Sequence, residues 1–232
     1  MIISIKTFQF LGCIVFLSTY QVIPAELIPD PKRFDKIFKD YRKSDQESFP
    51  KQDKLVLFTG SSSIRLWKNL PSSFPKVNTL NRGFGGAHLS DVLHFYDSLF
   101  PLYRPEQIVL YCGENDLWSG KPVDQVFDAF SKLWRKISID LPNSTLIYLS
   151  CKPSPKRISK WSVYQSLNRR VESFCNADSK LTFVDLSSTL LKVDMTFYDG
   201  LWSDDNLHVN NKGYYKWTLK IRPLLIQKPI SQ

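Results

Sequence analysis

Short, wholly apolar runs alternate along the chain with longer segments that carry a single apolar stripe. The apolar runs lie at residues 55–58, 108–111 and 146–149, and weaker ones lie at 77–80 and 183–184. A continuous apolar run of this length is typical of a strand that is buried on both faces. The sequence therefore predicts about five buried strands.

The stretches between these runs show the periodicity of amphipathic helices. In the stretch 31–44, the side chains of Phe34, Ile37, Phe38 and Tyr41 recur at the spacing of one helix face. Similar stripes occur at 91–99, 123–137, 162–175 and 211–222. We therefore expect helices in each of these stretches, and we expect the connections between elements to be short.

Strands that alternate with amphipathic helices predict an α/β fold. Helices on both faces of a mostly parallel sheet would give a three-layer α/β/α domain. In such sheets, ligands bind just beyond the carboxyl ends of the strands. Candidate functional residues are therefore those that follow the apolar runs, after Phe58, Leu80, Tyr111, Leu149 and Val184.

The first 25 residues differ from the rest of the chain. Lys6 is followed by an apolar run at 8–16 and then by small and turn-forming residues up to Pro24-Ala25, which is the order of a signal peptide. We expect residues 1–25 to be a signal peptide and residues 26–232 to form one secreted or periplasmic domain without stable membrane insertion. Two alternatives remain open: an uncleaved anchor, because Ile23 is unfavourable at its cleavage-site position, and a lipoprotein box at Leu11-Gly12-Cys13.

The charge and the cysteine content do not point to a nucleic-acid partner or a metal site. The 232 residues carry a formal net charge of +9, and the tightest basic cluster contains Lys152, Lys156, Arg157 and Lys160. Because two prolines interrupt this cluster, we interpret it as a solvated loop and expect no nucleic-acid partner. Three cysteines follow residue 25, namely Cys112, Cys151 and Cys175, so at most one disulfide pair can form among them. Cys112 and Cys151 each end an apolar run, and we expect both to be buried small side chains. The cysteines lack metal-ligand spacing, so we expect no metal site.

Two strand ends carry residues that can bind or attack a substrate. The run 55–58 leads into Gly60-Ser61-Ser62-Ser63, where a turn can expose a serine hydroxyl beside a helix N-terminus. The run 77–80 leads into 81–87, where three glycines within four residues, Gly86 among them, let backbone N–H groups approach a ligand. Each segment taken alone also fits an ordinary helix cap or turn.

Two further segments supply an amide and a possible acid–base pair. Asn115 follows the third strand, and its amide can point toward the same place as the glycine N–H groups. Asp205 stands three residues before His208, so its carboxylate can hold Nδ1 and leave Nε2 free to act as a base. His88, next to the glycine segment, is the rival candidate for the base.

Together, these four segments resemble the blocks of the SGNH, or GDSL-like, hydrolases, in particular a subset with a Gly-Ser-Ser-Ser-Ile-Arg first block. The resemblance covers approximately residues 31–226 and implies a five-stranded parallel sheet in a flavodoxin-like sandwich. It also implies the site residues, with Ser62 as nucleophile, Asp205 and His208 as its activating pair, and Gly86 and Asn115 in the oxyanion hole. Ser61 and Gly85 depart from the family pattern, in which an aspartate and a serine are usual.

The resemblance implies a serine esterase that needs no cofactor and cleaves small-molecule or glycan esters. With short connections there would be no lid or lipid tunnel, so we expect short acyl groups to be preferred. The alternative from another class is a catalytically inactive glycan-binding module on the same fold. The sequence does not single out the natural substrate.

Overall fold

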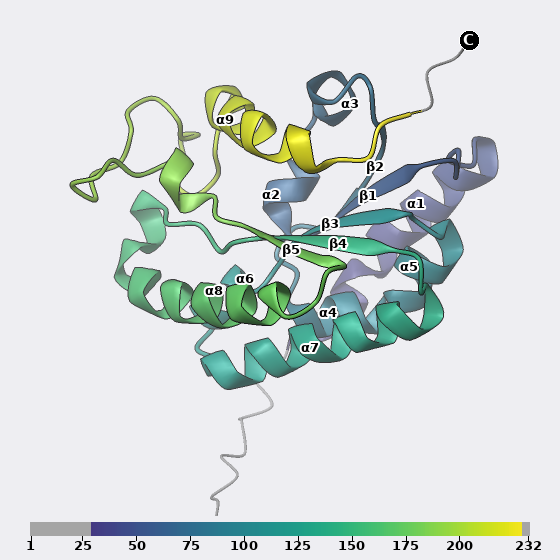
Figure 1. Ribbon diagram of the computed structural model, residues 1–232, viewed down its shortest axis with the longest axis horizontal. Coiled ribbons are helices and arrows are strands. Elements are labelled where there is room, and N and C mark those ends of the chain that lie inside the picture. Colours follow the sequence, from purple (N-terminus) through teal and green to yellow (C-terminus); the bar gives the residue numbers. More distant parts are fainter. Residues whose placement is uncertain (1–28, 229–232) are drawn as a thin grey trace, which may run out of the picture.

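The computed structural model describes residues 29–228, which form a sheet between two layers of helices (Figure 1). The strands are β1 Leu55–Gly60, β2 Asn78–Gly83, β3 Gln107–Tyr111, β4 Thr145–Leu149 and β5 Leu181–Val184. The α-helices are α1 Asp35–Glu47, α2 Ser62–Arg65, α3 Leu70–Ser73, α4 Leu89–His94, α5 Tyr96–Tyr103, α6 Glu114–Trp118, α7 Val123–Asp140, α8 Trp161–Asn176 and α9 Asn211–Ile221. Short 3₁₀ turns lie at Pro31–Phe34, Pro155–Lys160, Ser187–Thr189 and Arg222–Leu224.

The five strands form one parallel sheet in the order β2-β1-β3-β4-β5. Gly60 at the end of β1 pairs with Gly83 of β2 on one side and with Tyr111 of β3 on the other. The carboxyl ends of these three strands are therefore level. The predicted α/β/α sandwich with a five-stranded parallel sheet is confirmed.

Each face of the sheet has its own apolar core, because successive side chains of a strand point to opposite faces. Leu55 and Leu57 belong to the core between the sheet and helices α1, α4, α5, α7 and α8. Val56 and Phe58 belong to the core between the opposite face of the sheet and helices α2, α3 and α9. Figure 1 shows these two helical layers below and above the sheet. Every residue of β1 is buried, as its apolar sequence predicts.

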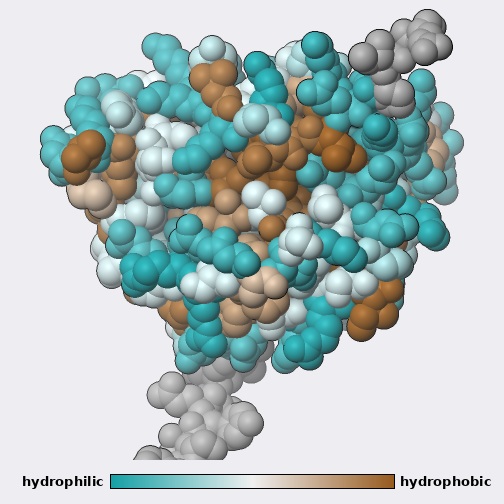
Figure 2. All heavy atoms as spheres, viewed as in Figure 1, coloured by the Kyte–Doolittle hydropathy of each residue, from teal (hydrophilic) through white to brown (hydrophobic). Residues whose placement is uncertain are grey.

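The edge strands explain why two of the predicted strands gave weaker signals. In β2, the first four residues are only half-buried, and in β5 the middle two are. An edge strand is covered less completely, so its sequence need not be apolar throughout. Figure 2 shows polar residues over most of the surface in that view, with apolar surface gathered near the centre, between the two helical layers.

Two expectations about local structure are wrong. The stripe predicted as one helix at 91–99 forms two helices, α4 and α5, because the backbone leaves the helical conformation at Phe95. The connections are not all short either. Residues 190–210 run without helix or strand between a 3₁₀ turn and α9, held by two isolated bridges, Leu191–Phe197 and Trp202–Val209.

The predicted signal peptide, residues 1–25, lies outside the described residues. Across residues 29–228, no helix is both long enough and apolar enough to cross a membrane.

Candidate active site

Ser62 is the first residue of α2 and follows a tight turn at the end of β1. Gly60 makes this turn with φ of +108°, a conformation that residues with a Cβ rarely adopt. A Cβ on Gly60 would also lie 2.2 Å from the carbonyl oxygen of Tyr111 on β3. The next backbone N–H, that of Ser61, donates to the same oxygen at 2.8 Å. The chain therefore leaves the sheet sharply, with Ser62 at its carboxyl edge.

His208 and Asp205 meet Ser62 from the irregular segment before α9. Nε2 of His208 lies 2.7 Å from Oγ of Ser62, and Nδ1 lies 2.5 Å from Oδ2 of Asp205. The other carboxylate oxygen of Asp205 accepts the backbone N–H groups of Leu207 and His208, each at 2.9 Å. The three side chains thus form one continuous chain of hydrogen bonds.

The ionisation of Asp205 sets the direction of these hydrogen bonds. Burial opposes the charge of Asp205, but the backbone N–H groups and the His208 ring lower its pKa to about 2. Because a carboxylate only accepts, Nδ1–H of His208 donates to Asp205. Nε2 is then an acceptor in the neutral ring, and the Ser62 hydroxyl donates to it.

Neither of the adjacent serines is placed like Ser62. The hydroxyl of Ser61 is buried and accepts the amide of Asn115 at 3.2 Å. Ser63 is buried as well, and its carbonyl oxygen accepts the Tyr214 hydroxyl of α9 at 2.8 Å. The structure therefore brings Ser62 to His208 and holds Ser61 and Ser63 in other contacts.

Gly86 and Asn115 lie at the ends of β2 and β3, on the same edge of the sheet. Gly86 is exposed with φ of +85°, and within residues 29–228 no protein acceptor is bonded to the backbone N–H of Gly86 or of Ser62. The amide nitrogen of Asn115 donates to the Ala87 carbonyl at 3.1 Å as well as to Ser61. Two backbone N–H groups around this strand end are therefore without a protein acceptor in the described residues, and the Asn115 amide nitrogen lies beside them with Ser61 and Ala87 as its acceptors.

His88 does not take part in this arrangement. Its ring is buried, and Nδ1 lies 3.6 Å from Oδ1 of Asp116, which is too far for a hydrogen bond. Burial, together with the positive charges of Lys121, Arg33 and Arg157, lowers the pKa of His88 to about 3. His88 is therefore neutral at physiological pH, and the structure brings His208 to Ser62 instead.

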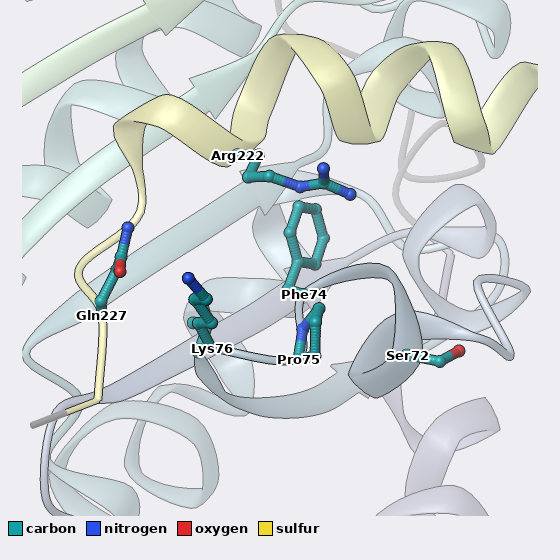
Figure 3. A pocket seen from close by; sticks show the side chains of 7 residues that line it. Ser72, Phe74, Pro75, Lys76, Arg222 and Gln227 are labelled. Carbon is teal, nitrogen blue, oxygen red and sulfur yellow. The ribbon is translucent and has the colours of Figure 1, made fainter. Parts of the chain in front are cut away.

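The cavities do not coincide with this arrangement of side chains. Of five surface cavities formed by the described residues, none is lined by Ser62, Asp205 or His208. The cavity in Figure 3, of about 360 Å³, is lined by Phe74, Lys76, Arg222 and their neighbours. It includes Val77, which precedes β2, and so lies at the amino end of that strand. The catalytic candidates lie at the opposite edge of the sheet.

The cysteines that the structure describes lie in the apolar core. Cys112, Cys151 and Cys175 are free and buried, which confirms the expected burial of Cys112 and Cys151. Among residues 29–228, no three His, Cys, Asp or Glu side chains are grouped so as to hold a metal ion.

The sequence profile of the GDSL-like Lipase/Acylhydrolase family matches residues 58–216. The chain belongs to this family. The matched range contains all four sequence blocks, from the turn before Ser62 to the first half of α9. The GDSL-like chain is accordingly a carboxylic ester hydrolase.

Solved structures show the same fold at low sequence identity. A protein from Streptococcus pneumoniae, provisionally assigned as platelet activating factor, is 20% identical with a TM-score of 0.74, over 84% of this chain and 94% of that one. A GDSL-like lipase from Bacteroides thetaiotaomicron is 20% identical with a TM-score of 0.69, and the match covers 81% of this chain and 96% of the lipase. A variant of an acetyl-xylooligosaccharide esterase from Geobacillus stearothermophilus is 14% identical with a TM-score of 0.62, and the match covers 79% of this chain and 99% of the esterase. A search of curated proteins found no match.

In this GDSL-like chain, Asp116 joins the two strand ends that carry the N–H donors. Its carboxylate accepts the backbone N–H of Leu89 at 3.1 Å and the ammonium of Lys121 at 2.8 Å. Leu89 begins α4, directly after the glycine segment, and Asp116 lies in α6 next to Asn115. The aspartate therefore fixes the distance between the Gly86 loop and Asn115.

The interpretation of the basic cluster as a solvated loop is wrong for two of its members. The Lys152 ammonium is buried and lies 3.0 Å from Oε2 of Glu114, and the Arg157 guanidinium lies 3.0 Å from Oε1. Glu114 is itself buried and also accepts the Tyr111 hydroxyl. Lys156, in contrast, is exposed, as expected. The cluster is thus partly an internal set of ion pairs directly behind the site.

Sequence reasoning missed these residues although a signal was present. Glu114 follows β3 and Lys152 follows β4, and neighbouring parallel strands end side by side. An acid and a base at adjacent strand ends can therefore pair beneath the site. The spacing of these charges along the chain does not reveal the pairing, which follows from the order of the strands.

We predict that Glu114→Gln lowers the free energy of unfolding by about 3–5 kcal/mol at pH 7, because it leaves two buried cations without their carboxylate. Burial alone would raise the pKa of Glu114, but Lys152 and Arg157 lower it below the ordinary value of 4.5. The stabilisation is therefore present above that value and is lost as the pH falls through the lower, folded-state pKa.

Urea unfolding at pH 7 and in acid measures this effect. The difference between Glu114→Gln and wild type should shrink in acid, while Glu172→Gln, at an exposed glutamate of α8, should match wild type throughout. A loss for Glu114→Gln that is as large in acid as at pH 7 would contradict the electrostatic explanation.

Proposed function

We propose that this protein is a serine esterase in which Ser62 is the nucleophile, His208 the general base and Asp205 the residue that orients His208. The observation that carries the proposal is the hydrogen-bonded chain from Asp205 through His208 to Ser62, with distances of 2.5 and 2.7 Å. A nucleophile within hydrogen-bond reach of a base, itself oriented by a third group, is the arrangement that activates a serine. An inactive binding module would not need this geometry.

In the proposed acylation step, Oγ of Ser62 attacks the ester carbonyl carbon as its proton passes to Nε2 of His208. The carboxylate of Asp205 stabilises the imidazolium that forms. The tetrahedral intermediate then collapses, the bond to the leaving alcohol breaks, and His208 returns the proton to that alcohol. The acyl group remains on Ser62 as an ester.

Three N–H donors are proposed to stabilise the negative oxygen of the tetrahedral intermediate. They are the backbone N–H groups of Ser62 and Gly86 and the side-chain amide of Asn115. The positive φ of Gly86 supports its role, because residues with a Cβ rarely adopt this conformation and the Gly86 N–H has no protein acceptor among the described residues. The N-terminus of α2 adds a favourable dipole at Ser62.

Deacylation repeats the same steps with water. His208 takes a proton from a water molecule, whose oxygen attacks the acyl carbon of the Ser62 ester. Collapse of the second tetrahedral intermediate releases the carboxylic acid, and His208 returns the proton to Oγ. Every proton in this scheme is carried by residues of the chain, so it includes no cofactor.

A short acyl group on a glycan or a small alcohol is the proposed substrate class. None of the five described cavities is lined by Ser62, Asp205 or His208, so none of these five is a deep acyl-binding cavity at the proposed nucleophile. The similarly folded acetyl-xylooligosaccharide esterase is named for an acetylated glycan substrate, which supports this substrate class.

We predict that Ser62→Ala abolishes ester hydrolysis and leaves the fold intact, because the hydroxyl lies at the sheet edge and not in either core. An organophosphate should label Ser62 alone, which mass spectrometry of the digested protein can locate. Ser61→Ala and Ser63→Ala serve as matched controls and should retain most of the activity. A covalent adduct on Ser61 or Ser63 would show that the nucleophile has been misassigned.

The pH dependence should report His208. Asp205, with a pKa of about 2, is charged and His88, with a pKa of about 3, is neutral at every pH above about 4.5. Burial raises the pKa of Asp116 to about 6, so Asp116 also changes its charge above that point. His208 must be neutral to accept the Ser62 proton, and variants of the histidines are needed to assign a rise in kcat/KM with pH to His208.

Measured pH–rate profiles of variants test this assignment. His208→Ala should remove the activity, while His88→Ala should retain it with the same midpoint as wild type. An inactive His88→Ala beside an active His208→Ala would exchange the roles of the two histidines.

Acyl-chain selectivity should reflect the shallow site. Each additional CH₂ contributes about 0.8 kcal/mol to binding only where it is buried. We therefore expect kcat/KM on p-nitrophenyl esters to be greatest from acetyl to butyryl and to fall by octanoyl. A maximum at dodecanoyl would show instead that a lipid chain has a binding site on this protein.

A further inference from the structure

A buried cluster of charged residues lies behind Asn115 and has no part in the proposed proton transfers. Glu114, the residue before Asn115, has its side chain 5% exposed and accepts the Tyr111 hydroxyl. The Lys152 ammonium, 1% exposed, and the Arg157 guanidinium, 13% exposed, each lie 3.0 Å from Glu114. Burying three charges is costly unless they are well paired, so their position so close to the reacting groups calls for a functional explanation.

Arg157 connects this cluster to the amide of Asn115. One terminal nitrogen of its guanidinium, Nη1, lies 3.0 Å from Oε1 of Glu114 and 3.0 Å from Oδ1 of Asn115. The two hydrogens of that nitrogen can serve the two acceptors at once. The guanidinium also lies over the ring of Trp118, 4.9 Å from its centroid. Arg157 is therefore fixed from three sides and presents a donor to the oxygen of the amide.

This contact decides which way the Asn115 amide faces. The oxygen and nitrogen of an asparagine side chain are almost equal in size, so their hydrogen-bond partners determine the orientation. With Oδ1 on Arg157, Nδ2 faces Ser61 and the Ala87 carbonyl. The flipped amide would bring its NH₂ group against the guanidinium and its oxygen against the carbonyl oxygen of Ala87, and both contacts are repulsive.

We propose that Arg157 is a positioning residue of the oxyanion hole: it holds the Asn115 amide with its nitrogen on the side of Ser61 and Ala87, next to Ser62, and Glu114, itself paired with Lys152, holds Arg157 in place. This inference rests on the proposed role of Asn115 in the esterase reaction. A cation at the amide oxygen also draws electron density from the nitrogen and makes its N–H a stronger donor. Arg157 thus acts through Asn115 and not on the substrate.

The segment that carries Arg157 also touches the Asp205–His208 turn. The backbone N–H of Lys156 donates to the carbonyl oxygen of Asn206 at 3.0 Å, and Asn206 lies between Asp205 and His208. The segment 152–157 therefore contacts both Asn115 and the turn between Asp205 and His208. A purely structural role for Arg157 would disturb the two together, and the test must separate these possibilities.

The test measures kcat and KM on p-nitrophenyl acetate for Arg157→Met in two backgrounds, wild type and Asn115→Ala. The matched control is Arg170→Met, which removes an arginine that also pairs with a carboxylate, Asp124, and lies over an aromatic ring, Phe127. Loss of a hydrogen bond from a charged group should lower kcat by about 10- to 100-fold in the wild-type background, with KM little changed. In Asn115→Ala, itself about 10²–10³-fold slower, the same substitution should lower kcat less than about threefold.

Arg157→Lys keeps a donor at this position and should recover part of the lost activity, whereas Arg170→Met should equal wild type. The pH midpoint of kcat/KM should be the same in Arg157→Met as in wild type, because His208 is undisturbed. Equal fold losses in both backgrounds, an effect confined to KM, or a shifted pH midpoint would each overturn the proposal.

A second measurement does not depend on activity. The side-chain NH₂ resonances of Asn115, assigned by their absence in Asn115→Ala, should shift in the ¹⁵N–¹H spectrum of Arg157→Met and not in that of Arg170→Met. Unchanged resonances in Arg157→Met would overturn the inference. A wild-type protein without esterase activity that nonetheless shows the shift would refute the proposed function while leaving the orientation of the amide established.

Discussion

The contact between Gly60 and the carbonyl oxygen of Tyr111 is the constraint on which the site depends. A Cβ at Gly60 would lie 2.2 Å from that oxygen, so no other residue permits β1 to end where it does. The contact lets the chain turn away from the sheet within one residue and start α2 at Ser62. It also fixes the height of β3 beside β1, because Gly60 pairs with Tyr111. The glycine therefore sets the position of the serine relative to Asn115, which follows β3.

Much of the fold could be predicted from the sequence, because the buried strands and the amphipathic helices leave distinct patterns. The runs in β1, β3 and β4 are apolar throughout, since these strands are covered on both sides. The edge strands β2 and β5 are covered less completely, so their sequences are less apolar and their patterns are weaker. The break at Phe95 could not be predicted, because the apolar stripe continues across it although the backbone there leaves the helical conformation.

The residues at the site differ in how far the sequence reveals them. Ser62, Asn115 and the Asp205–His208 pair lie in short motifs at strand ends, so position along the chain and residue type point to them. Lys152 and Arg157 were visible as charges but not as buried charges, because burial depends on the carboxylate opposite. Glu114 supplies that carboxylate from the neighbouring strand. Local sequence therefore identifies the reacting groups more readily than the groups that support them.

The segment 190–210 carries both the proposed base, His208, and its carboxylate, Asp205, while most of its residues lie outside the two cores. It is held by isolated bridges and by a few buried side chains such as Leu191 and Leu201, whereas Ser62 and Asn115 lie directly beyond the ends of β1 and β3. Segments with few buried contacts open more easily than sheets do. Opening of this segment would remove the base and its carboxylate together and leave the rest folded. Catalytic competence and global stability are therefore separate quantities in this chain, and an inactive molecule need not be an unfolded one.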